Sequence, residues 1–429
     1  MLFSSIEFLY YFLPLVILGY FLLPKQLRNG WLLIVSLVFY AWGEPKLIWV
    51  MLGSIVLNWL WGIGIGRAQK TGWKRFFLVL SCLTCLGLLG WFKYADFAFE
   101  NINALLGTKI PLPKLILPIG ISFYSFQILS YSIDVYRGQA KTQYNIVDFG
   151  CYVVLFPQLI AGPIVRYLDV AEQMKGRTHS VDKFGQGASR FVCGLSKKVL
   201  LANNIGMLWD TVAATPDRSI ALAWLGAAAF ALQIYFDFSG YSDMAIGLGK
   251  LLGFDFIENF NYPYISKSVT EFWRRWHISL GSWFRDYVYF PMGGSRVSRP
   301  RMFLNIFVVW MLTGFWHGAD WNFIIWGLYF AVLLVIEKVF LMKFLKKSRI
   351  IGRIYVLFAV LIYELVGPVM TRDALTRAGD IQPKSHEVIH RRAALLEFSK
   401  IVKMSENAMH KGMHKKKKKS FLCHFRKDG

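Results

Sequence analysis

The sequence predicts an all-α, polytopic integral membrane protein with about 9–11 transmembrane or re-entrant helices. Hydrophobic residues make up 55% of the 429 residues and charged residues only 17%, and the mean hydropathy is +0.41. That balance is typical of membrane proteins and excludes an ordinary soluble enzyme. Aromatic residues reach 17%, including 16 Trp, as expected at membrane interfaces or around a large membrane cavity.

Apolar runs recur along the chain as far as about residue 370. Several are shorter than the roughly 20 residues of a straight transmembrane helix, so we expect re-entrant segments or broken helices inside the bundle. Gly43-Glu44-Pro45 predicts a hairpin, and breaks at Pro118-Ile119-Gly120 and Gly162-Pro163 are typical of helices that line a cavity. The candidate spans are Phe8–Leu23, Trp31–Trp42, Leu47–Gly66, Phe76–Phe92, Leu115–Ile133, Val147–Ile164, Ser189–Leu208, Ile220–Phe236, Phe303–Phe315, Trp321–Phe340 and Ile354–Val369.

The formal net charge of +23 indicates membrane orientation rather than nucleic-acid binding, because much of it lies in short loops. Loops rich in Lys and Arg stay on the cytoplasmic side, so the N-terminus and Phe97–Lys114 are predicted to lie outside. We expect a multi-pass protein of the cell inner (cytoplasmic) membrane. The predicted cytoplasmic loops are Lys25–Arg28, Arg67–Arg75, Arg137–Lys141, Arg296–Arg301 and Lys343–Arg353. The mixed stretch Lys175–Asn203 predicts an interfacial amphipathic helix.

A change of composition near residue 371 divides the chain into two predicted parts. Residues 1–370 form the membrane domain, and residues 371–429 form a basic tail that we expect to be mostly disordered, with one helix around His390–Met404. The tail carries 15 Lys/Arg and 6 Asp/Glu and includes the run Lys415–Lys419. A solvated tail and contact with anionic lipids at the cytoplasmic face both fit this pattern.

One ionisable residue stands inside the most apolar part of the chain: His317. Ionisable side chains at membrane depth are rare unless they are functional or well paired. An imidazole there can act as a general base, as a nucleophile or as a metal ligand. A hydrogen-bonded core His is the alternative, but Gly314 and Gly318 beside it would let another backbone or a slender substrate approach, which favours function.

Further polar residues cluster between Gln233 and Gly318. Asp237 and Asp243 bracket an expected Gly turn, where carboxylates could bind a cation, orient a His or cap helices. His277 lies in a predicted amphipathic helix spanning Glu271–Tyr287, and it is either a packed structural His or a catalytic one. The aromatic face of that helix comprises Trp273, Trp276, Leu280, Trp283 and Phe284, at spacings of three and four residues.

Several other site classes find no support in the motifs. No metal site is predicted, because His277 and His317 are far apart and lack the spacing of metal ligands. The G-x-S-x-G elbow of serine hydrolases is missing, as are Rossmann and P-loop motifs. A transporter with His317 as a proton relay is the alternative from another class, although the sequence has neither an inverted repeat nor a chain of intramembrane acids.

The chain resembles the membrane-bound O-acyltransferase (MBOAT) family, and within it the members that O-acetylate bacterial polysaccharides such as alginate. The motifs follow the family's order over residues 1–370. Single motifs would not suffice, but the set is highly specific. The motifs are Pro118–Gln127, Phe156–Tyr167, Gln233–Asp243, Asn259–Tyr264, Phe272–Leu280, Arg285–Tyr287 with Pro291–Gly294, and Gly314–Gly327.

The resemblance implies an MBOAT-like helical bundle with a central funnel that leads to His317, the near-invariant active-site His of the family. His277 would be the second polar position on the same tunnel. The resemblance also implies transfer of an acetyl group from a cytoplasmic thioester, such as acetyl-CoA or an acylated carrier. The acceptor would be an extracytoplasmic acetyltransferase partner or a polysaccharide hydroxyl. We expect surrounding membrane lipids as partners, no nucleic acid and no bound cofactor, since the thioester is a substrate.

The chemistry of acetyl transfer fits these residues. His317 could take the proton of a hydroxyl as a base or could carry the acetyl group covalently. His277, or a nearby Asn or Trp N–H, could donate to the thioester oxygen, and the two Arg could hold a donor phosphate or lipid phosphates. The expected substrate-binding residues are Trp316, Trp273, Arg274, Arg275, Asn259, Asn261 and Asp237.

Two further interpretations remain at this point. Transfer of D-alanine toward teichoic acid is an alternative within the same family. A non-enzymatic scaffold of a polysaccharide synthesis complex is the other. The resemblance fades after about Val369, where members of the family usually continue with further membrane helices.

Overall fold

The computed structural model of the protein describes residues 2–160, 162–216, 219–345 and 347–362. The described residues form helices joined by loops, with no strand among them, so the predicted all-α class is confirmed. Contacts divide the chain into Met1–Gly367 and Pro368–Gly429. The second unit lies outside the described residues, as do the predicted helix His390–Met404 and the Lys415–Lys419 run.

The helices follow one another with short connections, and several α-helices continue directly into a π-helical segment (η). A last helix occupies residues 349–362, where the described part ends. In chain order the elements are η1 (Phe8–Phe12), α1 (Leu13–Leu22), η2 (Lys25–Leu27, a 3-10 turn), α2 (Arg28–Gly43), α3 (Ile48–Arg67), α4 (Thr71–Leu89), η3 (Gly90–Tyr94), α5 (Ala95–Leu106), α6 (Ile121–Tyr136), α7 (Ile146–Val154), α8 (Phe156–Leu159), α9 (Tyr167–Lys175), α10 (Val181–Ser196), η4 (Lys197–Ala202), α11 (Asn203–Ala214), α12 (Ile220–Leu251), η5 (Pro263–Ile265, a 3-10 turn), α13 (Val269–Arg275), α14 (Ile278–Phe284), η6 (Arg285–Tyr289), α15 (Arg299–His317), α16 (Trp321–Ile336), η7 (Glu337–Leu341) and α17 (Met342–Leu345).

Within the described residues, four helical stretches are long and apolar enough to cross a membrane. They are Ile48–Arg67, Thr71–Leu106, Ile220–Leu251 and Trp321–Leu345. Other expected spans are shorter or interrupted: the Val147–Ile164 run forms α7 and α8, and helix α6 begins only after Gly120, whose φ is 74°. The shorter elements agree with the expectation of broken helices within a membrane bundle.

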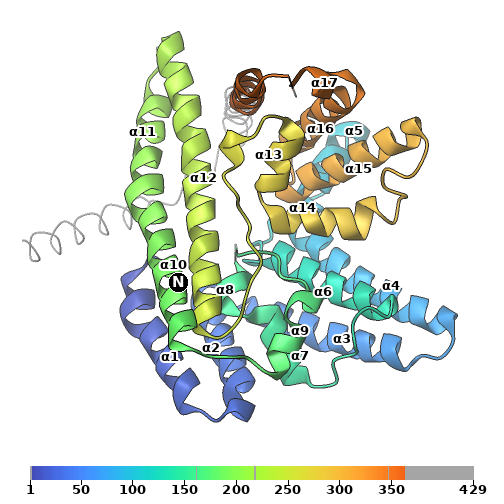
Figure 1. Ribbon diagram of the computed structural model, residues 1–429. Coiled ribbons are helices and arrows are strands. Elements are labelled where there is room, and N and C mark those ends of the chain that lie inside the picture. Colours follow the sequence, from blue (N-terminus) through green and yellow to red (C-terminus); the bar gives the residue numbers. More distant parts are fainter. Residues whose placement is uncertain (1, 161, 217–218, 346, 363–429) are drawn as a thin grey trace, which may run out of the picture. The chain divides into compact units, whose positions relative to one another are not determined.

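Helix α12 is the longest helix among the described residues and lies along α10 and α11 (Figure 1). The predicted turn between Asp237 and Asp243 is wrong, because the helix continues through it. Position 240 requires a glycine because of helix packing: a Cβ there would lie 2.8 Å from the carbonyl oxygen of Gly194 on α10. The glycine therefore permits close helix packing rather than a turn.

The predicted single helix Glu271–Tyr287 is also wrong, because the chain breaks at Trp276–His277 into α13 and α14. His277 has φ 45°, in the left-handed region. The segment around Asn259–Asn261, which is neither helix nor strand, forms hydrogen bonds with this break. Asn261 N–H donates to the Arg275 carbonyl at 2.9 Å, and Ile278 N–H donates to the Asn259 carbonyl at 3.0 Å. These bonds satisfy backbone groups that a continuous helix would have paired internally.

Hydrogen bonds between small polar side chains join three helices in the interior. The Ser81 hydroxyl on α4 contacts Asn58 on α3 and Ser132 on α6, each at 2.7 Å, and all three residues are buried. Such interhelical bonds are typical of membrane bundles. Aromatic side chains fill the neighbouring core, where Phe8 and Phe156 have no exposed surface.

We predict that Gly247→Ala destabilises the bundle, because its Cβ would lie 2.6 Å from Phe191 N and 2.7 Å from Gly187 O on α10. Overpacking of this kind costs about 1–3 kcal/mol. The thermal unfolding midpoint in detergent, followed by Trp fluorescence, should fall by several degrees. Gly185→Ala is the matched control on α10, since a Cβ there meets nothing within 4 Å. Equal midpoints for the two variants would contradict the close α10–α12 contact.

Candidate active site

A cavity of about 450 Å³ lies among α13, α14, α15 and α16 with the segments that follow them. Most of its wall is aromatic or aliphatic, but both predicted histidines contribute to it, together with three basic side chains. The lining residues are Thr270, Trp273, Arg274, Trp276, His277, Leu280, Gly281, Phe284, Arg285, Tyr289, Ile306, Val309, Trp310, Thr313, His317, Leu334, Lys338 and Met342. An apolar cleft with a few convergent polar groups is the usual form of a small-molecule site.

His317 is the last residue of α15, and its side chain is exposed to the cavity. The helix ends there because Gly318 is extended and Asp320 then caps α16 by accepting from Asn322 N–H at 2.8 Å. The imidazole lies between two indoles, with ring centroids 4.8 Å from those of Trp316 and Trp326. His317 is therefore held between rigid aromatic surfaces at the point where two helices meet.

Glycines bring α15 and α16 together at this end. A Cβ on Gly314 would overlap the carbonyl group of Phe323, and one on Gly327 would overlap that of Trp310. The sequence-based expectation that Gly314 admits another backbone agrees with this contact. The close crossing fixes His317 relative to α16.

His277 also lines the cavity and is only 4% exposed. Its Nδ1 lies 3.1 Å from Asn259 Oδ1. The same oxygen accepts from the backbone N–H of Ser279 at 3.2 Å and from the Ser279 hydroxyl at 2.9 Å. The Ser279 hydroxyl in turn accepts from Ile164 N–H at 3.0 Å, which connects this network to the Phe156–Tyr167 motif.

These bonds determine the tautomer of neutral His277. A backbone N–H can only donate, so the Asn259 atom that Ser279 N–H contacts must be the amide oxygen. An oxygen that accepts requires a proton on His277 Nδ1, which leaves Nε2 with a lone pair. Nε2 is buried and has no hydrogen-bond partner among the described residues. Neutral His277 therefore presents an acceptor.

Two indole N–H groups beside the histidines also lack a partner in the described part of the chain: Trp273 Nε1, on the cavity wall, and Trp316 Nε1. The Trp316 ring lies 6.0 Å from that of His277. Buried N–H groups are almost always hydrogen-bonded, so unpaired ones need an explanation. Of these groups, Trp273 and His277 belong to residues that line the cavity, so the cavity wall includes one unpaired donor and one unpaired acceptor.

A buried carboxylate holds α13, the helix that carries Trp273. Glu337, with no exposed surface, accepts from Val269 N–H at 2.5 Å, Thr270 N–H at 2.9 Å and the Thr270 hydroxyl at 2.6 Å. These are the first N–H groups of the helix, which have no partner inside it, and a negative charge is favourable there. Glu337 was not among the residues predicted from the sequence.

The predicted site residues fall into two groups. His317, His277, Trp273 and Arg274 line the cavity, while Trp316 and Asn259 contact the two histidines directly. The structure does not bring three others to the cavity. Arg275 pairs with Glu271 at 2.8 Å, Asn261 is exposed, and Asp237 on α12 pairs with Lys198.

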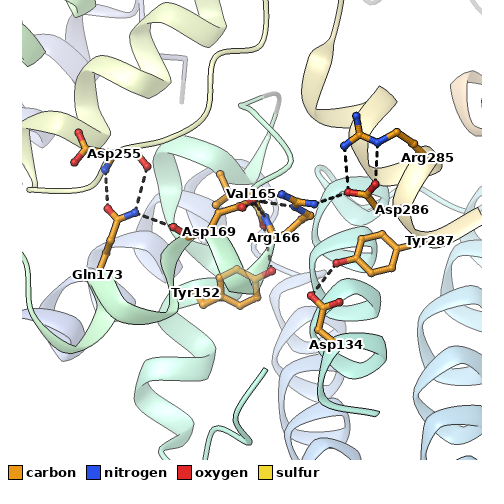
Figure 2. Close-up of polar contacts among 10 residues, drawn as sticks. All are labelled: Asp134, Tyr152, Val165, Arg166, Asp169, Gln173, Asp255, Arg285, Asp286 and Tyr287. Carbon is orange, nitrogen blue, oxygen red and sulfur yellow. Dashed lines mark hydrogen bonds and ion pairs between the residues drawn. The ribbon is translucent and has the colours of Figure 1, made fainter. Parts of the chain in front are cut away.

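A second cavity of about 630 Å³ lies beside η6. Its lining includes several residues of an ion-pair network, whose contacts are drawn in Figure 2. Arg166 pairs with Asp169 at 3.0 Å and with Asp286 at 2.7 Å, and its bonds to Asp169 raise the pKa of the guanidinium. Tyr287 donates to Asp134 at 2.8 Å. The network fastens η6 to α6 and α9, and η6 also supplies Arg285 and Tyr289 to the first cavity.

Residues 132–368 match the model of the MBOAT, membrane-bound O-acyltransferase family. The chain is 47% identical to "Probable alginate O-acetylase AlgI" of Pseudomonas aeruginosa over 79% of this chain and 66% of that protein. It is 35% identical to the peptidoglycan O-acetyltransferase of Helicobacter pylori, over 79% of this chain and 71% of the relative.

A more distant match is the teichoic acid D-alanyltransferase of Bacillus subtilis, 29% identical over 62% of this chain and 74% of that protein. The chain thus spans about two thirds of the length of the most similar of these three relatives. The family match includes both histidines, the cavity and the ion-pair network. The apolar helices and this match establish a multi-pass membrane protein. The chain belongs to the membrane-bound O-acyltransferase family.

Proposed function

We propose that the protein is an O-acyltransferase of the cytoplasmic membrane that transfers acetyl groups from a cytoplasmic thioester toward an extracytoplasmic polysaccharide. The observation that carries the proposal is the pair His277 and His317 on one aromatic cavity. The names of the relatives support the reaction class: alginate O-acetylase and peptidoglycan O-acetyltransferase. An alginate-like exopolysaccharide is the proposed acceptor, reached directly or through an extracytoplasmic partner enzyme.

In this proposal, the acyl thioester donor enters the cavity where its basic side chains lie. Arg274, Arg285 and Lys338 all line it and are exposed. Among the described residues, no carboxylate pairs with Arg274 or Lys338, so both are available to a phosphate of CoA or phosphopantetheine. Lys338 also precedes the basic loop Lys343–Arg353, which the positive-inside rule assigns to the cytoplasm.

His317 is the proposed base, since its imidazole is open to the cavity. It takes the proton of the acceptor hydroxyl while the hydroxyl oxygen bonds to the thioester carbonyl carbon. The carbon–sulfur bond then breaks, and the imidazolium returns its proton to the departing thiolate. In the covalent alternative, the imidazole nitrogen attacks the thioester first, the thiol leaves, and the acetyl-imidazole passes its acetyl group to the hydroxyl.

The developing negative charge on the thioester oxygen needs a hydrogen-bond donor. Neutral His277 does not provide one, because its Nε2 carries the lone pair. The unpaired N–H of Trp273 does, and Trp273 lies on the cavity wall. We therefore assign the thioester oxygen to Trp273, whereas His277 lines the cavity as a hydrogen-bond acceptor.

Cells expressing His317→Ala at matched membrane levels are expected to lose the acetyl esters of their surface polysaccharide, because no base remains. Ester content after mild alkaline release measures this, and mass spectrometry of the released acid separates acetate from D-alanine. His179→Ala, remote from the cavity, is the control. Wild-type ester content in His317→Ala would refute the assigned role, and release of D-alanine would favour the teichoic-acid alternative.

Trp273→Phe keeps an aromatic ring but removes the N–H. Loss of a single oxyanion donor reduces turnover by roughly a hundredfold, and we expect a loss of that order. The readout is the initial rate of acetyl transfer in membranes supplied with radiolabelled acetyl-CoA. Trp209→Phe, which packs against Phe230 on α12, controls for the general loss of an indole. A rate within about threefold of wild type would exclude Trp273 as the main donor.

Asn259→Ala removes the oxygen that sets the His277 tautomer, so the transfer rate should fall by about tenfold or more. Asn259→Asp retains an acceptor and should recover part of the rate. Asn204→Ala, on the exposed side of α11, is the control. Equal losses in the Ala and Asp variants would show that the acceptor at this position is not what matters.

A further inference from the structure

Lys93 brings a positive charge to the end of the helix that carries His317. The residue lies in η3, within the apolar stretch Thr71–Leu106, and is half-buried. Its ammonium group donates to the carbonyl oxygen of Trp316, and Nζ lies 5.7 Å from the centroid of the Trp316 ring. A cation at such a depth is costly and usually functional.

Tyr94 reinforces the same contact. Its hydroxyl donates to the carbonyl oxygen of Phe315 at 2.7 Å, and its ring stacks on that of Phe315 with centroids 4.0 Å apart. The last carbonyls of a helix have no partner inside it. Lys93 and Tyr94 thus satisfy the two carbonyls that immediately precede His317, and they do so from η3, a π-helical segment of the kind that often occurs at functional sites.

The positive charge of Lys93 also offsets the negative end of the α15 helix dipole. The C-terminus of a helix carries a partial negative charge, and here it lies beside His317 on the cavity. Acyl transfer generates negative charge on the thioester oxygen and then on the leaving thiolate. Without a nearby cation, the negative end of α15 would oppose that charge. None of the ion pairs among the described residues involves Lys93, so a carboxylate does not neutralise it.

We propose that Lys93 is a positioning residue for acyl transfer: it holds the C-terminal turn of α15, and with it His317, and offsets the negative end of that helix. This inference rests on the proposed function. Lys93 precedes residues 132–368, the region that matches the family model, so the N-terminal helices complete a site whose other parts lie in that region.

The test compares Lys93→Met, Lys93→Gln and Lys93→Arg with wild type and His317→Ala in reconstituted full-length protein, with acetyl-CoA as the donor probe. We expect kcat to fall by roughly tenfold or more in Lys93→Met, with KM for acetyl-CoA changed by less than about threefold. Lys93→Gln should be intermediate, and Lys93→Arg should recover most of the rate. Lys109→Met, an exposed lysine in the loop after α5, is the control.

Hydrogen–deuterium exchange supplies a measurement that does not depend on activity. The amides of residues 312–318 should exchange faster in Lys93→Met than in wild type, whereas those of α12 should be unchanged. Faster exchange with a tenfold lower kcat and rescue by Arg supports the proposal. Unchanged exchange, or faster exchange with wild-type kcat, overturns it. If wild type transfers no acetyl group, the proposed function fails, and unchanged exchange in Lys93→Met would then also overturn the anchoring role.

Discussion

The candidate site depends on hydrogen-bond partners for helix ends that lie inside a membrane bundle. The N–H and C=O groups at such ends have no partner in their own helix, and bulk water does not reach them, so other parts of the protein must bind them. Helices α13, α14, α15 and α16 all begin or end around the cavity. The partners match the sign of each helix end: the Glu337 carboxylate binds the N-terminus of α13, and the Lys93 ammonium binds the C-terminus of α15. Charged groups of both signs thus stabilise the backbone around the cavity.

Close packing between helices fixes the positions of the side chains at these helix ends. Gly314 and Gly327 let α15 and α16 touch backbone to backbone, which places Trp326 against His317. At the break between α13 and α14, His277 has a left-handed backbone conformation, and its imidazole contacts Asn259. A non-glycine residue in that conformation is energetically unfavourable, and it persists here because the bonds from Asn259 and Asn261 hold both sides of the break.

The sequence predicted His317 from its place in an apolar run and Trp273 from an aromatic pattern, and both side chains line the same cavity. Their roles in the reaction stay predictions. The pattern also suggested one continuous helix, because periodicity alone does not reveal a backbone break stabilised by a distant segment. Asp237 was predicted to bind substrate, but in the structure its carboxylate pairs with Lys198. Glu337 and Lys93 carry the same signal as His317, because each is an ionisable residue within an apolar helical stretch, and this signal could have predicted them.

Unpaired polar atoms discriminate between the classes of function. Others exist in the described residues, such as the Tyr40 hydroxyl and Asn305 Oδ1, so an unpaired atom alone identifies nothing. Trp273 and His277 differ because both residues line one cavity, and one has an unpaired donor nitrogen and the other an unpaired acceptor nitrogen. A carbonyl oxygen needs such a donor, and in the proposed mechanism His317 takes the hydroxyl proton. A proton relay instead requires consecutive groups that bond to one another, whereas these two face a common cavity and a third molecule must join them. A cavity with such a donor and acceptor is typical of a site that binds a small molecule rather than of a proton pathway.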